Sequence, residues 1–183
     1  MTGARGPLAA ILLASALCAG GPAAAAGAPV PGAPAVPVVS AEGYGAVRFG
    51  MTPAQAEALL QRPLRPLAPA AGRPCVFLYP DGDPNAIVAF LLSGGRIERI
   101  DVRSRAVPTG EGVRIGDSEA RLLALYAGRT VVEPRRGGGP DDRLVTVRDA
   151  DGTHALVFET RGGRVVAYHA GRLPEATYVA GCS

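Results

Sequence analysis

Lysine and tryptophan are absent from the sequence, which has only two histidines and three cysteines among its 183 residues. Without tryptophan, the chain lacks the commonest stacking platform for sugars and has only tyrosine and phenylalanine for that task. The two histidines, His154 and His169, have no cysteine or acidic partner at zinc-binding spacing, so we expect no metal site and no cofactor. All basic residues are arginines, and their mixture with acids at a net charge of +3 excludes the electrostatic field of a nucleic-acid-binding protein.

The N-terminal region lacks the apolar run of about 20 residues that a membrane-spanning helix needs, so we predict no transmembrane helix. It has instead the parts of a secretory signal peptide: Arg5 is positive, residues 7–19 form a short apolar run, and small residues follow at 22–27. We predict a signal peptide at 1–26 and a periplasmic or secreted protein. Cys18 leaves another route open, because a cysteine at the end of such a run can carry the lipid of a bacterial lipoprotein. Only in that case would we expect attachment to a membrane.

Two cysteines, Cys75 and Cys182, remain after removal of the signal peptide, in an oxidising compartment. A disulfide between them is the simplest expectation, with two buried free thiols as the alternative. The bond would tie the end of the chain to the first half of the folded region.

Residues 27–40 are rich in proline and have neither charge nor periodicity. Such a composition is typical of an extended spacer without a core of its own. We therefore predict a disordered spacer over 27–40 and a folded domain over 41–183.

The folded region contains related stretches twice. VRFGMTPAQAEALL (47–60) returns as VRIGDSEARLLALY (113–126), and further on AFLLSGGRI returns as VFETRGGRV. A Gly-Gly pair between two β-rich runs indicates a hairpin in each copy. We interpret the pattern as a tandem repeat with units at 41–109 and 110–183.

Each copy begins with a helix signal. Thr52 and Ser118 stand where a helix N-cap belongs, and the residues after them predict short helices at about 53–61 and 119–127. Three β-rich runs follow each helix. The predicted fold is α+β, with tandem duplicated αβββ units whose short helices pack on an antiparallel sheet.

One pattern points to an enzyme. Ser118, with Asp151 and His154, resembles the serine and Asp-x-x-His blocks of the GDSL hydrolases. Ser118, however, occupies the N-cap position that Thr52 fills in the other copy, and the supporting Gly and Asn blocks of that family are not evident. We therefore predict a protein that is not an enzyme, with a GDSL-like hydrolase as the last alternative.

The segment DGDPN (81–85) spaces three oxygen ligands like the start of a calcium-binding loop. Ala86 and Leu92 stand where an EF-hand requires Gly and Glu. The other copy keeps Asp149 and Asp151 at the matching places. We therefore interpret these acids as turn residues.

Arginine and tyrosine side chains on the predicted strands suggest a recognition surface, because both offer flat area together with hydrogen bonds. The strand after the first Gly-Gly pair has charged residues of one parity, and the matching strand of the second copy carries a tyrosine and a histidine. A solvated sheet face is the alternative interpretation. The predicted ligand-binding residues are Tyr79, Arg99, Asp101, Arg103, Tyr168 and His169.

The motifs GYGAVRFGM, FLYP after Cys75, ALYAGR, LVFETRGGRV and the ending AGRLPEATYVAGCS occur between Gly43 and Ser183. On these motifs the chain resembles a group of poorly characterised bacterial secreted proteins, some of which are labelled lectins. The resemblance implies a secreted protein that binds a carbohydrate, and it brings no binding residues with it.

The repeated unit of GMT, helix and sheet is similar at fold level to the β-lactamase inhibitory protein and to the small lipoprotein of the outer-membrane barrel-assembly machinery. Both act by binding proteins, and the likeness is one of fold. Together the two resemblances imply a non-catalytic binding protein whose partner is a glycan or, alternatively, an envelope protein, including a hydrolase to be inhibited.

Overall fold

The computed structural model describes residues 1, 3, 36–70, 72–178 and 182. The predicted signal peptide lies outside the described residues apart from Met1 and Gly3, and so do Cys18 and residues 27–35 of the predicted spacer. The chain divides into two units, 1–34 and 35–183, and every helix and strand of the described residues lies in the second.

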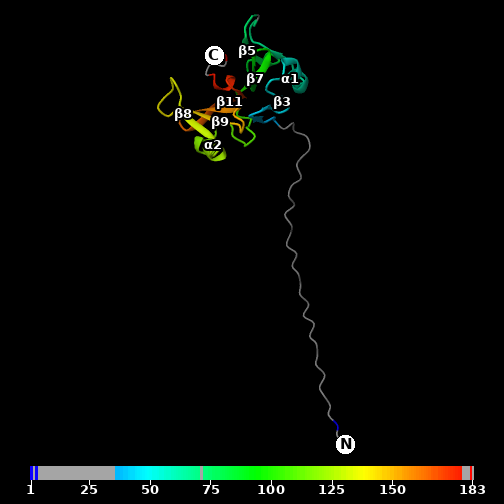
Figure 1. Cartoon of the computed structure of the whole chain (residues 1–183), viewed down its shortest axis with the longest axis vertical. Helices are drawn as coiled ribbons and strands as arrows, with labels where there is room; N and C mark the ends of the chain where they lie inside the picture. Colours follow the sequence, from blue (N-terminus) through cyan, green and yellow to red (C-terminus); the bar gives the residue numbers. More distant parts are fainter. Residues whose placement is uncertain (2, 4–35, 71, 179–181, 183) are drawn as a thin grey trace. The chain divides into compact units, whose positions relative to one another are not determined.

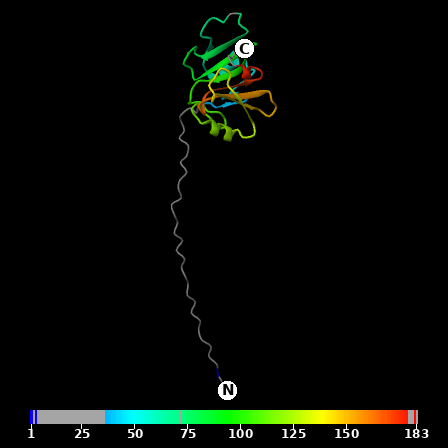
Figure 2. The same ribbon diagram turned by 90° about the vertical axis from the view of Figure 1, so that its left-hand side faces the viewer.

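An eight-stranded antiparallel sheet runs through this second unit (Figures 1 and 2). Its strand order is β4-β5-β6-β7-β11-β10-β9-β8, so β7 and β11 pair in the middle of the sheet and join the first half of the unit to the second. The hairpins β6–β7 and β10–β11 turn at the two predicted Gly-Gly pairs, where all four glycines have positive φ. The strands are β4 (Leu64–Arg65), β5 (Cys75–Pro80), β6 (Val88–Ser93), β7 (Arg96–Val102), β8 (Thr130–Pro134), β9 (Arg143–Arg148), β10 (His154–Arg161) and β11 (Arg164–Arg172).

Three short strands, β1 (Val39–Ser40), β2 (Gly43–Tyr44) and β3 (Val47–Arg48), form a second, small antiparallel sheet. Strand β1 lies within the predicted spacer, which is a correction at its last two residues. Burial explains the difference, because the Val39 side chain has no exposed surface. The folded part therefore begins before residue 41.

Two α-helices, α1 (Pro53–Leu60) and α2 (Glu119–Leu125), lie where their caps predict them, one or two residues shorter than expected at the C-terminal end. Thr52 and Gln55 form a capping box, with the Thr52 N–H donating to the Gln55 side chain at 2.9 Å. The Ser118 hydroxyl accepts from the Arg121 N–H at 3.2 Å. These bonds satisfy backbone donors that a helix start leaves unpaired.

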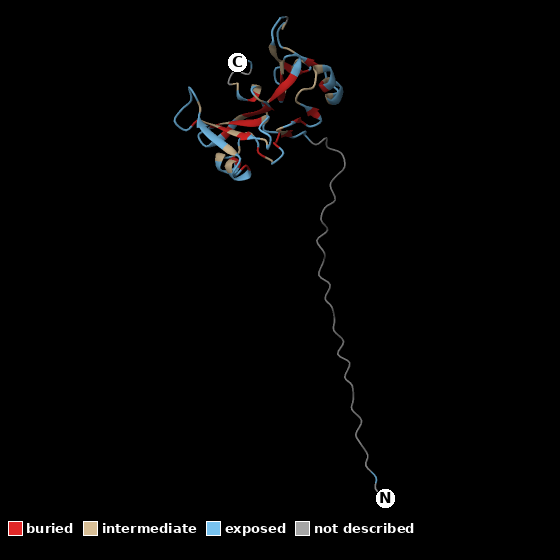
Figure 3. Cartoon of the chain, viewed as in Figure 1, coloured by how far each residue is buried: buried red, intermediate tan, exposed pale blue. Residues whose placement is uncertain are grey.

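The main core lies between the helices and one face of the sheet (Figure 3). Aromatic rings fill it, with the centroids of Tyr126 and Phe158 5.7 Å apart and those of Phe158 and Tyr168 5.4 Å apart. Ala56 of α1 and Leu122 of α2 have no exposed surface against this face. On this face the apolar side chains of both halves of the sheet thus belong to one continuous core.

The other face of the sheet is crossed by the C-terminal strap, which we define as Leu173–Tyr178 together with Cys182. The strap contains the 3₁₀-helix η1 (Glu175–Thr177), which contacts β7, β10 and β11. Ala176 is fully buried against Ala155 and Val157 of β10. At its end Cys182 is joined to Cys75 by the predicted disulfide, with the two Cα atoms 5.7 Å apart.

The fold is therefore α+β and rich in antiparallel sheet. Each helix is followed by four strands rather than the predicted three, because the edge strands β4 and β8 pair outside β5 and β9. Among the described residues, neither helix approaches the length and apolar character required to cross a bilayer.

Candidate functional site

The sheet face under the strap holds three of the six predicted ligand-binding residues, Arg99, Asp101 and His169. The Arg99 side chain is only 4% exposed and forms a two-pronged ion pair with Asp101, with Nε–Oδ1 at 2.5 Å and Nη2–Oδ2 at 3.0 Å. Its remaining nitrogen, Nη1, donates to the backbone carbonyls of Glu175 and Tyr178 in the strap. Arg99 therefore holds the strap through Nη1, while Nε and Nη2 bind Asp101.

His169 lies beside Arg99 under the same strap. Its Nε2 is 2.8 Å from the carbonyl oxygen of Ala176 and donates to it. Burial, followed by the charge of Arg99, lowers the pKa of His169 to about 4, although the Asp101 carboxylate acts in the opposite direction. The ring is therefore neutral at pH 7, and its Nδ1 has no hydrogen-bond partner among the described residues.

Tyr168, in contrast, lies on the opposite face from Arg99, because neighbouring residues of a strand point to opposite sides of the sheet. Its side chain is 1% exposed, its ring stacks on Phe158, and its hydroxyl donates to the Val107 carbonyl at 2.9 Å. The prediction that placed Tyr168 with Arg99 on one recognition surface is therefore corrected. Tyr168 contacts the core.

The last two predicted residues, Tyr79 and Arg103, contact each other away from the strap. The Arg103 guanidinium lies over the Tyr79 ring, 5.6 Å from its centroid, and also donates to the Pro84 carbonyl at 3.2 Å. Arg103 is exposed and Tyr79 is half-buried. The structure thus divides the six predicted residues among three places.

Beside the strap, the same sheet face is hollowed into a groove of about 420 Å³, here called the strap groove. Leu144 of β9 and Val157 of β10 provide its apolar sheet surface, and Tyr178 lines it from the strap. The buried ring of His169 also lines it. The sequence does not predict this groove, because the residues that line it come from segments far apart in the chain.

Charged side chains surround the strap groove at the end of β8. Arg135 forms an ion pair with Glu159 at 3.1 Å, and both side chains remain about one third exposed or less. Glu133 and Arg136 line the same end and are exposed. The groove therefore combines an apolar surface with a few polar groups of both signs, the composition usual for binding sites.

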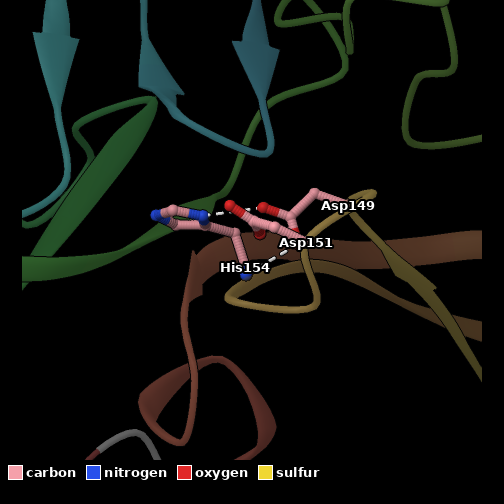
Figure 4. A group of neighbouring side chains, drawn as sticks. All are labelled: Asp149, Asp151 and His154. Atoms are coloured by element: carbon pink, nitrogen blue, oxygen red, sulfur yellow. Dashed lines mark hydrogen bonds and ion pairs between the residues drawn. The ribbon is translucent and has the colours of Figure 1, made fainter.

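A second group of chemically active side chains, Asp149, Asp151 and His154, lies in the turn between β9 and β10 (Figure 4). Asp149 Oδ2 is 2.8 Å from His154 Nδ1, and Asp149 Oδ1 accepts from the His154 backbone N–H at 3.0 Å. Burial alone would raise the pKa of the Asp149 carboxyl, but these bonds and those from the neighbouring turn hold it below its usual value. The Thr153 hydroxyl donates to Asp151 at 2.7 Å.

No acidic partner at zinc-binding spacing is expected for His154, but in the structure Asp149 pairs with its Nδ1, and a carboxylate oxygen of Asp151 belongs to the same group of ligand atoms within 4.8 Å. The signal was present in the spacing of Asp149-Ala150-Asp151-Gly152-Thr153-His154, which a tight turn folds back on itself. The group contains no cysteine and only one histidine, so it does not have the cysteine and histidine spacing of a zinc motif.

The hydrolase alternative requires Ser118 to reach His154. The backbone of Ser118 pairs with that of Arg164 at one end of the β10–β11 hairpin, while His154 pairs with Arg172 at the other end. At about 3.4 Å per residue, the length of β10 separates them by roughly 20 Å. Ser118 caps α2, so these three residues do not form a catalytic triad.

No family profile and no curated protein sequence matches the chain. Among solved structures, the crystal structure of the uncharacterized protein yfeY from Escherichia coli is similar to it, with a TM-score of 0.49 and 21% sequence identity. The alignment covers 74% of this chain and 99% of that one.

Proposed function

We propose that this protein is a non-catalytic binding protein, periplasmic or secreted, that holds its ligand in the strap groove. The observation that carries the proposal is the groove itself, a concave site with an apolar surface and convergent polar groups on a sheet face stabilised by a disulfide. The disulfide also supports an oxidising compartment.

We further propose that the sheet is built from a duplicated helix-and-sheet unit. The repeated stretches of sequence fall on α1 and α2 and on the hairpins β6–β7 and β10–β11. The strand order is also symmetric about the β7–β11 pair, with β4 and β8 at the two edges. In this arrangement most of the strap groove is formed by the second copy of the repeat, residues 110–183.

A glycan is the first candidate ligand. The lectin label of the similar secreted proteins suggests it. The groove offers the phenol ring of Tyr178 together with the hydrogen-bonding side chains of Glu133 and Arg136. An aromatic face combined with charged acceptors and donors suits a sugar ring, which has an apolar face and polar edges.

The test is binding of the purified protein, without the predicted signal peptide, to a broad array of immobilised glycans. Replacing Tyr178 and Arg136 by alanine removes groove contacts, and replacing Arg103 by alanine is the control on the same sheet face away from the groove. We expect saturable binding that free sugar competes away, at least about tenfold weaker in the groove variant and unchanged in the control. Absence of binding across the array contradicts the glycan proposal, and equal loss in both variants contradicts the groove.

An envelope protein is the second candidate. The observation that favours it is the edge strand β8, where Val131 and Val132 are 54% and 43% exposed. The outer backbone groups of β8 face no further strand among the residues that the structure describes. Such an edge is suited to the addition of a strand from another protein. A photo-crosslinker at Val131 should then give a discrete product in intact cells that the same crosslinker at exposed Leu59 does not give.

A further inference from the structure

We propose that Asp149, Asp151 and His154 form a binding site for a divalent transition-metal ion of the Zn²⁺ class. One imidazole nitrogen and two carboxylate oxygens lie within 4.8 Å of one another, and Figure 4 shows the ring and both carboxylates converging over the turn. None of the three residues lines the strap groove, so the site is separate from the proposed ligand site.

The turn between β5 and β6 corresponds to this turn in the first half of the sheet. Comparing the two shows which residues are needed to form the turn. There Asp83 accepts from the Asn85 N–H at 2.8 Å, just as Asp151 accepts from the Thr153 N–H at 2.9 Å. Both halves therefore build the same turn with one aspartate. The first turn has Ala86 at the place of His154, so the turn forms without an imidazole.

Charge balance also differs between the two turns. In the first, the Asp81 carboxylate forms an ion pair with Arg62. In the second, the matching Asp149 has no arginine partner among the described residues, and its ion-pair partner is His154. The second turn thus brings two carboxylates and one imidazole together, an arrangement that a cation would complete.

The donors are also held in place before a metal binds. The His154 ring stacks on Phe49, at the end of β3, with 5.9 Å between centroids and 27° between planes. Asp149 is held through the His154 backbone N–H. The side chains of Asp149 and His154 are 19% and 22% exposed, and Asp149 lines a hollow of about 400 Å³, so an ion can enter from solvent.

The donor set decides the class of metal. An imidazole with carboxylates suits Zn²⁺ and its neighbours, whereas Ca²⁺ and Mg²⁺ prefer oxygen ligands alone. A metal ion binds through a ring nitrogen that carries no proton, so binding at His154 Nδ1 requires the ring proton to lie on Nε2 and the contact with Asp149 to be replaced by bonds to the metal. A small widening of the 2.8 Å contact brings the two atoms to the spacing of adjacent zinc ligands, about 3.3 Å.

The experiment titrates Zn²⁺ into the purified, tag-free protein by calorimetry, with Co²⁺ absorption as a second readout of ligand type. We expect one site per chain, with an affinity at least about tenfold lower in His154→Ala and in Asp149→Asn. Even substitutions of residues that only hydrogen-bond to metal ligands lower metal affinity by that much. Asp151→Asn, on the exposed side of the turn, serves as the variant least prone to misfolding. Circular dichroism checks the fold of each variant.

The matched control is Asp83→Asn in the first turn, which removes the equivalent carboxylate and leaves the proposed site intact. It should bind Zn²⁺ like the natural protein. Absence of stoichiometric binding, or equal affinity in the natural protein and in the folded Asp151→Asn and His154→Ala variants, overturns the proposal. Neither result bears on the strap groove, because none of these residues lines it.

Discussion

Arg99 and His169 are polar side chains that the sheet uses for attachment of the strap. A buried arginine is costly unless its charge is paired and its donors are satisfied. Here Asp101 supplies the charge and two strap carbonyls supply acceptors, while His169 stays neutral and donates to a third. The strap is thus fixed to the sheet through its backbone, which requires no particular strap side chains at these contacts.

The neutral state of His169 predicts a loss of stability in acid. Its pKa falls from 6.5 in the unfolded chain to about 4 in the fold, chiefly through burial. The neutral ring therefore contributes fully to the free energy of unfolding above pH 6.5. This contribution, about 3 kcal/mol in total, is lost as the pH falls toward 4. Urea unfolding at a series of pH values measures this loss.

The control for that measurement is His169→Gln, which keeps a side-chain N–H and cannot titrate. Between pH 7 and 4 the free energy of unfolding of this variant should fall less than that of the natural protein. Parallel curves for the two proteins would show that His169 is not the titrating group.

The helix caps give a prediction at the level of elements. Replacing Thr52 by alanine removes one side of the capping box of α1 and should lower the free energy of unfolding by about 1 kcal/mol. Thr52→Ser keeps the acceptor oxygen and should cost little. Chemical denaturation measures both, and equal losses in the two variants would attribute the effect to packing of the threonine methyl group.

Elements with a strong local signal could be predicted from the sequence. Thr52 and Ser118 mark both helix starts because capping is a contact between residues three apart. The Gly-Gly hairpins are equally local. The sequence does not predict strand β8. Val131 and Val132 are adjacent, so apolar and polar residues do not alternate there, and on this edge strand both side chains are exposed.

The candidate sites were harder to predict than the elements. Strand alternation alone separates Tyr168 from its neighbour His169, so their opposite faces could have been inferred. The path of the strap could not, because the contact between Arg99 and Tyr178 joins residues 79 apart through a backbone carbonyl. No side-chain pattern encodes such a contact, and the strap groove depends on it.

At the scale of the whole molecule, the disulfide links the strap to β5 across the sheet. Cys75 and Cys182 close a loop of 107 residues, and a loop of about 100 residues contributes up to ~4.7 kcal/mol in the chain-entropy model. We expect the Cys75→Ser, Cys182→Ser double variant to lose a large part of that amount in urea unfolding. The reduced natural protein is the control and should unfold with the same midpoint as the variant. A midpoint equal to that of the oxidised protein would contradict the role of the bond.

The strap follows every described strand of the sheet along the chain, and this fixes the order in which the disulfide can form. At about 5–20 residues per second, Cys75 is synthesised roughly 5–20 s before its partner 107 positions later. For that interval the Cys75 thiol is available to other thiols in the surroundings. A chain that stops before the strap therefore keeps a free thiol on β5 and an Arg99 side chain without its strap acceptors.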